Sequence, residues 1–245
     1  MLFMQCAFAQ IQNKKLVWQE NFDGTDLNQK NWNFETGNGC PSLCGWGNNE
    51  SQIYTNSNHV LKNGKLIITV QKKDNIYTST KITTKSKKEF LNGYIEARAK
   101  LPIGQGLWPA FWMLGANITE IGWPKCGEID ILEYVGREPH TVYTTLHTQD
   151  SHGNSVNTKK TFLAAIENGF HTYGIDWTKN KIDFFVDKKL VYHFEPTPKN
   201  GDTWPFDKPF YVILNLAIGG NFGGFQIDDS VLPQQFTIDY VKVYQ

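Results

Sequence analysis

The sequence has no excess charge of either sign and no long hydrophobic run. Its 245 residues include 24 Lys+Arg and 24 Asp+Glu, so the formal net charge is zero. A neutral chain is poorly suited to nucleic acid, an anionic membrane or a polyanionic substrate. No segment approaches the roughly 18 consecutive apolar residues of a membrane-spanning helix. We therefore expect a neutral ligand, no nucleic acid partner and no transmembrane segment.

Cysteine is scarce, with four residues in the chain. Cys40 and Cys44 lie four positions apart without a second Cys or His pair, which argues against a zinc site. In an oxidising compartment they would close a small disulfide loop, and otherwise they remain unpaired thiols. Cys126 is expected to be a buried free thiol.

The first nine residues are almost wholly apolar, and the letters AFA at 7–9 resemble a signal-peptide cleavage site. The segment is short and lacks a preceding Lys or Arg, so it is interpreted as the remnant of an export signal at 1–9. An ordinary apolar N-terminus, or a lipid anchor on Cys6, is the alternative. We expect one domain over residues 10–245 and a secreted, periplasmic or cell-surface location.

Helical patterns are almost absent, whereas aromatic residues make up 14% of the chain. Segments rich in β-branched and aromatic residues, bounded by turn residues, predict strands at 65–71, 93–100, 109–114, 128–135, 142–148, 171–177, 181–186, 190–194, 210–218 and 236–244. Only 161–167 has the composition of a short helix, and Asn63-Gly64 predicts a turn. This pattern predicts an all-β jelly-roll sandwich of two antiparallel sheets.

The segment at 93–100 separates its residues between two faces. Alternation places Ile95, Ala97 and Ala99 in the core and turns Arg98 to the opposite side. That opposite side is either a solvated surface or one wall of a binding cleft, and the strand alone favours the solvated surface.

Three acids are concentrated in GEIDILEYVG at 127–136. In a regular strand Glu128 and Asp130 share a face, while Glu133 would point into the core, where an unpaired carboxylate is costly. A β-bulge near Ile131-Leu132 adds one residue and returns Glu133 to the face of the other two acids. We therefore predict a bulged strand with three aligned carboxylates.

Aligned carboxylates repel one another, so at least one pKa must rise, which suits acid/base chemistry. Two such groups about 5–5.5 Å apart match the separation of retaining glycosidases. Glu128 is then the nucleophile, Glu133 the acid/base, and Asp130 a hydrogen-bonding partner that tunes both. A solvent-facing acidic strand edge is the alternative.

Tryptophans surround the acidic segment. Trp108 and Trp112 lie four apart in one predicted strand and share a face, and Trp123 precedes Glu128 by five residues. Indole rings offer flat apolar surfaces for sugars and an N–H for hydroxyl groups. We expect these three tryptophans to bind substrate, with packing in the core as the alternative.

The stretch GEIDILEYVG, with GLWPAFWML before it, resembles the bulged E-x-D-x-x-E signature of glycoside hydrolase family 16, in its laminarinase branch. Further segments agree, namely WQENFDG at 18–24, CGWGNNESQIYT at 44–55, NGKLIITV at 63–70, GYIEARAKLP at 93–102, TTLHT at 144–148, LNLAIGG at 214–220 and IDYVKVY at 238–244. The resemblance implies a jelly roll with a concave cleft and endo-hydrolysis of β-1,3-glucan with retention of configuration.

The resemblance also implies further site residues. Substrate contacts are expected from Asn48 or Asn49, Arg98, His147 and Asn215, which reverses the solvated placement of Arg98. His147 is a buried structural histidine in the alternative reading. Asn215 stands in an apolar run, so its amide needs a partner.

No cofactor is expected for catalysis, but the resemblance implies a structural calcium ion. Asn21, Gly64 and Asp239 occupy the matching positions, although the family commonly has an acidic residue where Asn21 stands. Calcium takes 6–8 oxygen ligands, some of them from water.

The leading hypothesis is thus a secreted, monomeric endo-β-1,3-glucanase acting on laminarin-like glucan, with mixed β-1,3-1,4-glucan as a further substrate. An agarase or carrageenase of the same fold and a non-catalytic glucan-binding lectin are the alternatives. The lectin is disfavoured because binding alone does not require three mutually repelling carboxylates.

Overall fold

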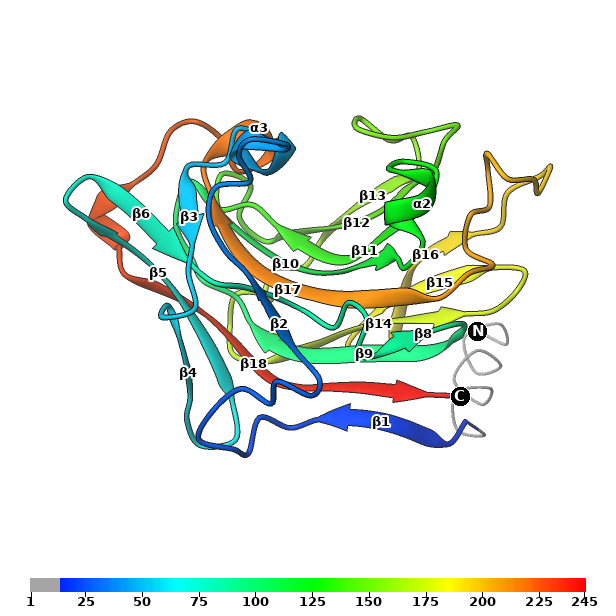
Figure 1. The fold of residues 1–245 in the computed structure, drawn as a ribbon, viewed down its shortest axis with the longest axis horizontal. Coiled ribbons are helices and arrows are strands. Elements are labelled where there is room, and N and C mark those ends of the chain that lie inside the picture. Colours follow the sequence, from blue (N-terminus) through cyan, green and yellow to red (C-terminus); the bar gives the residue numbers. More distant parts are fainter. Residues whose placement is uncertain (1–13) are drawn as a thin grey trace.

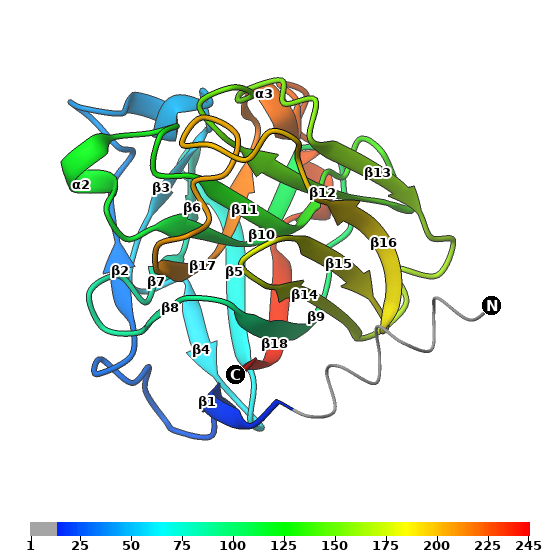
Figure 2. The same ribbon diagram turned by 90° about the vertical axis from the view of Figure 1, so that its right-hand side faces the viewer.

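Two stacked β-sheets make up most of the structure, a computed structural model that describes residues 14–245 (Figure 1, Figure 2). The predicted signal remnant at 1–9 lies outside the described residues. The all-β jelly-roll prediction is confirmed, and both sheets are predominantly antiparallel.

The first sheet has ten strands in the order β16-β15-β14-β9-β18-β5-β6-β3, with β1 on β18 and β4 on β5. The strands are β1 (Leu16–Glu20), β3 (Gln52–Tyr54), β4 (His59–Leu61), β5 (Leu66–Lys73), β6 (Ile76–Ser79), β9 (Gly93–Lys100), β14 (His171–Trp177), β15 (Ile182–Val186), β16 (Lys189–Phe194) and β18 (Gln234–Tyr244). The exception to antiparallel pairing in this sheet is β3 with β6.

The second sheet has eight strands in the order β13-β12-β11-β10-β17-β7-β2, with β8 on β17. The strands are β2 (Asn33–Glu35), β7 (Lys81–Thr83), β8 (Glu89–Phe90), β10 (Leu107–Gly115), β11 (Glu128–Tyr134), β12 (Thr141–His147), β13 (Thr158–Phe162) and β17 (Phe210–Ile218). Short helical turns are η1 (Cys44–Gly47), α2 (Ile118–Ile121), α3 (Gly220–Gly223) and η2 (Asp229–Val231). Figure 1 shows β17 bowed, with α2 and α3 above opposite ends of this sheet.

The core lies between the sheets and follows from strand alternation. Phe111 and Met113 of β10 are fully buried against the other sheet, whose Ile95 and Ala97 belong to the same cluster. The intervening residues of β10, including Trp108 and Trp112, point the other way and belong to separate small clusters. The eight-stranded sheet therefore has a second, polar and aromatic face turned away from the core.

Each of the ten predicted strands is present, with ends that move by two residues at most. The predicted Asn63-Gly64 turn is also confirmed: both residues have positive φ (54° and 65°), and Lys62 N donates to Lys65 O at 2.9 Å. The predicted helix at 161–167 is wrong. Residues 158–162 form β13, because they pair with the edge of β12 from Thr141 to Thr145.

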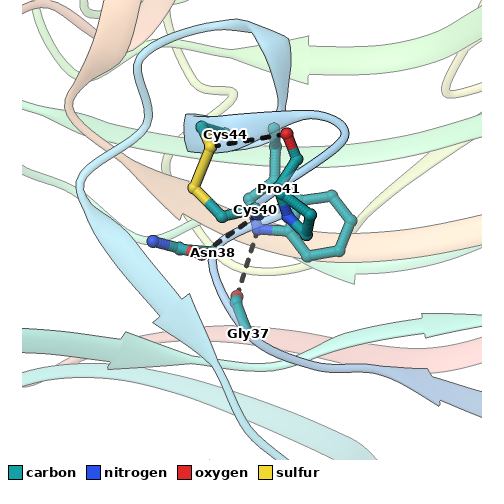
Figure 3. The surroundings of a disulfide bond; sticks show 6 residues. Gly37, Asn38, Cys40, Pro41 and Cys44 are labelled. Carbon is teal, nitrogen blue, oxygen red and sulfur yellow. Dashed lines mark hydrogen bonds between the residues drawn. A yellow bond between two sulfur atoms is a disulfide. The ribbon is translucent and has the colours of Figure 1, made fainter.

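The Cys40–Cys44 disulfide is present, and Cys126 is free and buried, as predicted (Figure 3). The loop around the disulfide is held by the side chain of Asn38, which accepts from Cys40 N at 3.1 Å. Trp46 Nε1 donates to Gly37 O at 3.3 Å. Within residues 14–245, no helix is long and apolar enough to cross a membrane.

Candidate active site

The predicted bulge is present in β11. Phe111 pairs with Leu132 while Trp112 pairs with Asp130, so Ile131 is the extra residue of the strand. The pairing of β11 with β12 shifts over the same interval. Ile131 and Leu132 both enter the core, and Glu133 returns to the side of Glu128 and Asp130.

The strand register explains which residues surround these acids. One row crosses the eight-stranded sheet as Glu35, Lys81, Asn215, Ala110, Glu133 and Tyr143. The small side chain of Ala110 separates Asn215 from Glu133, which leaves space above β10. We call this side of β7, β10, β11, β12 and β17 the acidic face.

Two indoles and one imidazole contact the three acids. Trp108 Nε1 donates to Glu133 Oε1 at 3.1 Å, and Trp123 Nε1 donates to Glu128 Oε2 at 2.8 Å. His147, opposite Glu128 in the register, places Nε2 3.3 Å from Asp130 Oδ2 and 3.9 Å from Glu128 Oε1. Three predicted site residues, Trp108, Trp123 and His147, thus lie against the acids.

Burial and mutual repulsion keep protons on the cluster. Burial, with the charge of Asp130 next, raises the pKa of Glu128 to about 8. Burial raises the pKa of Asp130 to about 7 and holds the pKa of Glu133 well above its usual range. The side chains of Glu128 and Asp130 are 18% and 4% exposed, so Glu128 is the better hydrated of these two. The cluster therefore combines a carboxyl group that holds its proton, Glu133, with carboxyl groups that ionise more readily.

Asn215 has the partners that a buried amide needs. Its Oδ1 accepts from Trp112 Nε1 at 2.7 Å, and its Nδ2 donates to Tyr54 OH at 3.0 Å. Tyr54 OH in turn donates to Glu50 Oε2 at 3.3 Å, and Glu50 also accepts from Gln52 at 2.5 Å. A continuous chain of hydrogen bonds therefore runs from Glu50 to Trp112 and fixes the orientation of the Asn215 amide.

Sequence reasoning missed Glu50, Tyr54 and Lys81. Lys81 is 8% exposed, opposite Asn215 in the register, and its Nζ lies 2.8 Å from Glu35 Oε2. The same Nζ lies 4.3 Å from the Trp46 ring centroid and 5.2 Å from that of Trp112. The sequence did not predict strand β7, because three residues are too few to show the alternation of apolar and polar side chains.

The predicted placement of Arg98 in the cleft is wrong. Arg98 belongs to β9 of the ten-stranded sheet, where it points away from the core and NH1 lies 2.5 Å from Asp239 Oδ2. Its guanidinium carbon lies 4.7 Å from the centroid of Phe170. Alternation in β9 favours the solvated surface that the structure shows, whereas Lys81 is a buried basic residue on the acidic face.

Asn48 lies beside the acidic face without contacting the three acids. Its Nδ2 donates to Glu50 Oε1 at 3.4 Å, and its backbone O accepts from Asn221 N at 2.7 Å. Asn49 Nδ2 donates to Asn221 Oδ1 at 2.9 Å. These bonds tie the disulfide-containing loop to α3 at one end of β17.

The residues proposed for calcium come together at one place in the structure. Asn21 O and Gly64 are neighbours, and Leu66 pairs with Ile238, which brings Gly64 and Asp239 to the same region. The Asp239 carboxylate, however, lies 2.5 Å from Arg98 NH1 and 3.6 Å from Lys65 Nζ, so two cations already neutralise it.

The adjacent carboxylate, Glu20, is also engaged. It accepts from Phe22 N, Asn31 Nδ2 and Trp32 Nε1 at 3.2, 3.1 and 3.2 Å. Calcium binding at this place stays a prediction.

A separate surface hollow lies away from the three acids. Its volume is about 440 Å³, and its lining includes Asn117, Ile121, Lys125 and Trp204. None of the three acids Glu128, Asp130 and Glu133 lines this hollow, so we do not assign it to the active site.

Known proteins share both the sequence and this architecture. The family model of glycosyl hydrolases family 16 matches residues 47–242. Glucan endo-1,3-beta-glucosidase of Cryptopygus antarcticus is 38% identical over 99% of this chain and 96% of its own length. Glucan endo-1,3-beta-glucosidase A1 of Niallia circulans is 38% identical over 96% of this chain, which spans only 38% of that protein.

The crystal structure of laminarinase from Flavobacterium sp. UMI-01 is also similar. It superposes with a TM-score of 0.93 at 65% identity, over 94% of this chain and all of that one. The similarity therefore covers the acidic face together with the whole sandwich.

Proposed function

The chain belongs to glycosyl hydrolase family 16, and we propose that it is an endo-β-1,3-glucanase that cleaves laminarin-like glucan with retention of configuration. The observation that carries the proposal is the bulged strand β11, which brings Glu128, Asp130 and Glu133 to one face. Such a face concentrates negative charge where an oxocarbenium-like transition state develops positive charge.

In the first step the Glu128 carboxylate attacks the anomeric carbon, and the bond from this carbon to the leaving oxygen breaks. Glu133 gives its proton to that oxygen, a role that suits the carboxyl group whose pKa is held well above its usual range. The product is a glycosyl ester on Glu128. The Trp123 N–H at 2.8 Å from Glu128 Oε2 favours the ionised form of the attacking group.

In the second step water attacks the glycosyl ester. The Glu133 carboxylate now takes a proton from that water, and Glu128 leaves as a carboxylate, so two inversions give net retention. The Asp130 carboxyl group hydrogen-bonds Glu128, which raises the pKa of Glu128 and lowers that of Asp130. In this contact Glu128 holds the shared proton and Asp130 accepts it, so attack by Glu128 requires that proton to pass to Asp130 or to solvent.

The sugar units are proposed to lie along the tryptophans of the acidic face. Trp123 is 45% exposed and offers ring surface to a pyranose beside its contacts with His147 and His152. Trp108 is 9% exposed and serves mainly to orient Glu133. Lys81, Asn215 and Trp112 form a polar and aromatic group on β7, β17 and β10 that is suited to hydroxyl contacts.

Substrate specificity is tested by measuring reducing-end release from laminarin, lichenan, agarose and carrageenan. The wild type should cleave laminarin fastest, Glu128→Ser should not cleave it, and Glu120→Ser, an exposed acid on α2, should behave as the wild type. Cleavage of lichenan as well extends the activity to mixed-linkage glucan. Activity on a galactan alone, or laminarin binding without cleavage by the wild type, would contradict the proposal.

The two roles are separated by azide rescue on an aryl β-glucoside with a good leaving group. Glu133→Ala should yield a β-configured glycosyl azide, because azide replaces water in the second step. Glu128→Ala should yield an α-configured azide, because azide then attacks directly. The reverse pair of products would exchange the two assignments.

Export is proposed from the N-terminal segment and the Cys40–Cys44 disulfide, which is typical of oxidising compartments. Because residues 1–9 are interpreted as a remnant of the signal, residues 10–245 are produced in the periplasm behind a complete bacterial export signal and, separately, in the reducing cytoplasm without one. We expect the Cys40–Cys44 pair to be oxidised, and the thermal stability to be higher, in the exported protein. Equal stability of the two preparations, with the pair reduced in both, would contradict it.

A further inference from the structure

A histidine and two acids of the acidic face converge on one point. Glu128, Asp130 and His147 each offer one ligand atom, and these three atoms lie within 4.8 Å of one another. His147 Nε2 is 3.3 Å from Asp130 Oδ2 and 3.9 Å from Glu128 Oε1. Within residues 14–245, this is the one group of three His, Cys, Asp or Glu side chains with such spacing.

One of these atoms is buried without a partner. Asp130 is 3% exposed, and its Oδ2 neither accepts nor donates a hydrogen bond, although it points toward His147 Nε2. The approach is an ion pair only when the imidazole is protonated. A buried carboxylate oxygen without a hydrogen-bond partner is costly, and a cation between this oxygen and the imidazole nitrogen would satisfy both atoms.

The remaining ligand is also available. Glu128 uses Oε2 to accept from Trp123 Nε1, which leaves Oε1 facing His147. Tetrahedral zinc with bonds of about 2.0–2.2 Å holds its ligand atoms about 3.4 Å apart. The distances of 3.3 and 3.9 Å thus lie close to that spacing before any side chain moves.

We propose that Glu128, Asp130 and His147 form a binding site for a divalent transition metal ion, with Zn²⁺ as its expected occupant. One imidazole and two carboxylates supply three ligands, and a water molecule completes the tetrahedron. The imidazole selects Zn²⁺ over Mg²⁺ and Ca²⁺, which prefer oxygen ligands only. Because the ion uses Glu128 Oε1, the site is inhibitory: metal and sugar compete for the same carboxylate.

The metal site is tested first by direct binding. Protein freed of metals with EDTA is titrated with ZnCl₂ by calorimetry, and Co²⁺ is added separately to record the visible absorption of a tetrahedral complex. We expect one Zn²⁺ per chain and a Co²⁺ spectrum that Zn²⁺ abolishes and Mg²⁺ leaves unchanged. Absence of both signals would overturn the proposal.

The ligands are tested with His147→Asn and a matched control, His193→Asn. His193 also contacts carboxylates, with Nδ1 2.5 Å from Asp183 and Nε2 3.8 Å from Glu195, but belongs to no group of three. Loss of His147 should weaken Zn²⁺ binding at least about tenfold, since even the loss of a residue that only hydrogen-bonds a metal ligand costs about 10–100-fold. Loss of His193 should change it less than twofold.

Equal affinity in the wild type and His147→Asn would contradict the assignment. Asp130→Asn, which keeps the side-chain shape, provides a second variant if His147→Asn fails to fold, and should show the same weakening. Thermal melts establish that each variant is folded.

The proposal that Zn²⁺ inhibits glucan cleavage rests on the proposed function, and it is measured separately from metal binding. A laminari-oligosaccharide should raise the apparent dissociation constant for Zn²⁺, and Zn²⁺ should inhibit laminarin cleavage competitively. Zn²⁺ binding in a protein without glucanase activity would keep the metal site and refute the glucanase. Full activity without any Zn²⁺ binding would refute the metal site alone.

Discussion

Both sheets bury acids on the face turned away from the core, but they surround them differently. On the ten-stranded sheet Asp183 meets Lys181 and His193, each at 2.5 Å, and Asp176 lies 3.3 Å from Lys14. Asp239 is paired with Arg98 and Lys65. Each of these three carboxylates has a cationic partner, whereas Glu96 on β9 of the same sheet accepts from two tyrosine hydroxyls, each at 2.8 Å.

The acidic face provides far less compensation. Its three acids receive two indole N–H groups, and the single basic group beside them is His147. Lys81, the basic residue of the neighbouring strands, is paired with Glu35 instead. The difference indicates that the ten-stranded sheet uses acids for stability, whereas the acidic face keeps them under-compensated, as chemistry requires.

The sharpest test of this contrast is the loss of one carboxylate from each face. Glu133→Gln should lower kcat on laminarin by about 10²–10⁴-fold, because the leaving oxygen no longer receives a proton. Asp183→Asn should leave kcat unchanged, since Asp183 lies on the other sheet. Steady-state kinetics measure both, and a comparable loss in the two variants would remove the distinction.

Stability should respond to pH through Glu128. Its pKa in the folded protein is about 8, raised from 4.5, so the folded state holds this proton more tightly than the unfolded state. The wild type therefore loses stability as pH rises from about 4.5 to 8. Glu128→Gln avoids this loss and should be more stable by a few kcal/mol at pH 8.5, at about 1.4 kcal/mol per pKa unit.

The measurement is urea unfolding at pH 5 and pH 8.5 in the presence of EDTA. The gain from Glu128→Gln should be small at pH 5 and grow with pH. A gain that is independent of pH would mean that proton uptake is not its cause.

On the ten-stranded sheet, neutralising a buried carboxylate should lower the free energy of unfolding instead of raising it. Asp183→Asn removes a buried carboxylate from two cationic partners, and should lower the free energy of unfolding by about 1–3 kcal/mol. Lys179→Gln, an exposed residue in the turn between β14 and β15, serves as a control for loss of a surface charge. Urea unfolding at pH 7 measures both, and a stabilised Asp183→Asn would contradict the structural role of this acid.

A smaller effect is expected from the indole that contacts Glu128. Trp123→Phe keeps an aromatic ring but removes the N–H at 2.8 Å, which lowers the pKa of Glu128 in the wild type. The acid limb of the kcat/KM profile should therefore move to higher pH. Trp204→Phe, away from the acids, should not move it, and an unchanged limb in Trp123→Phe would exclude this contact as a determinant.

The smallest effect is expected at Arg98. Its side chain is 37% exposed and paired with Asp239 on the outer side of the ten-stranded sheet. Arg98→Met should leave kcat and KM for laminarin within about twofold and reduce stability by no more than about 1 kcal/mol. Lys81→Met should raise KM, because Lys81 lies on the acidic face. A large KM increase from Arg98→Met alone would restore the cleft placement.

Much of the site was predictable because it depends on spacing along one strand. The five residues from Glu128 to Glu133 conflict with alternation, and a bulge is the simplest physical resolution, which the register confirms. Trp108 and Trp112 share a face for the same reason of parity. A buried amide at Asn215 likewise demanded partners before their identity was known.

The rest depends on which strands become neighbours. Strand alternation predicts that Arg98 points away from the core, but each of the two sheets has a face that does so. Pairing of β9 with β14 and β18 places Arg98 on the ten-stranded sheet and therefore away from the three acids. Lys81 faces the acids because three residues of β7 pair with β17.

By itself, the sequence determined the all-β class, the neutral balance of charge and the bulged strand with three acids, since each follows from local pattern and composition. Tertiary structure decided which acidic and basic side chains become neighbours. Asp176, Asp183 and Asp239 of the ten-stranded sheet have cationic partners, whereas no lysine or arginine among residues 14–245 pairs with the three acids of β11. Contacts across a sheet join residues far apart in the chain, so only the folded structure decides these partners.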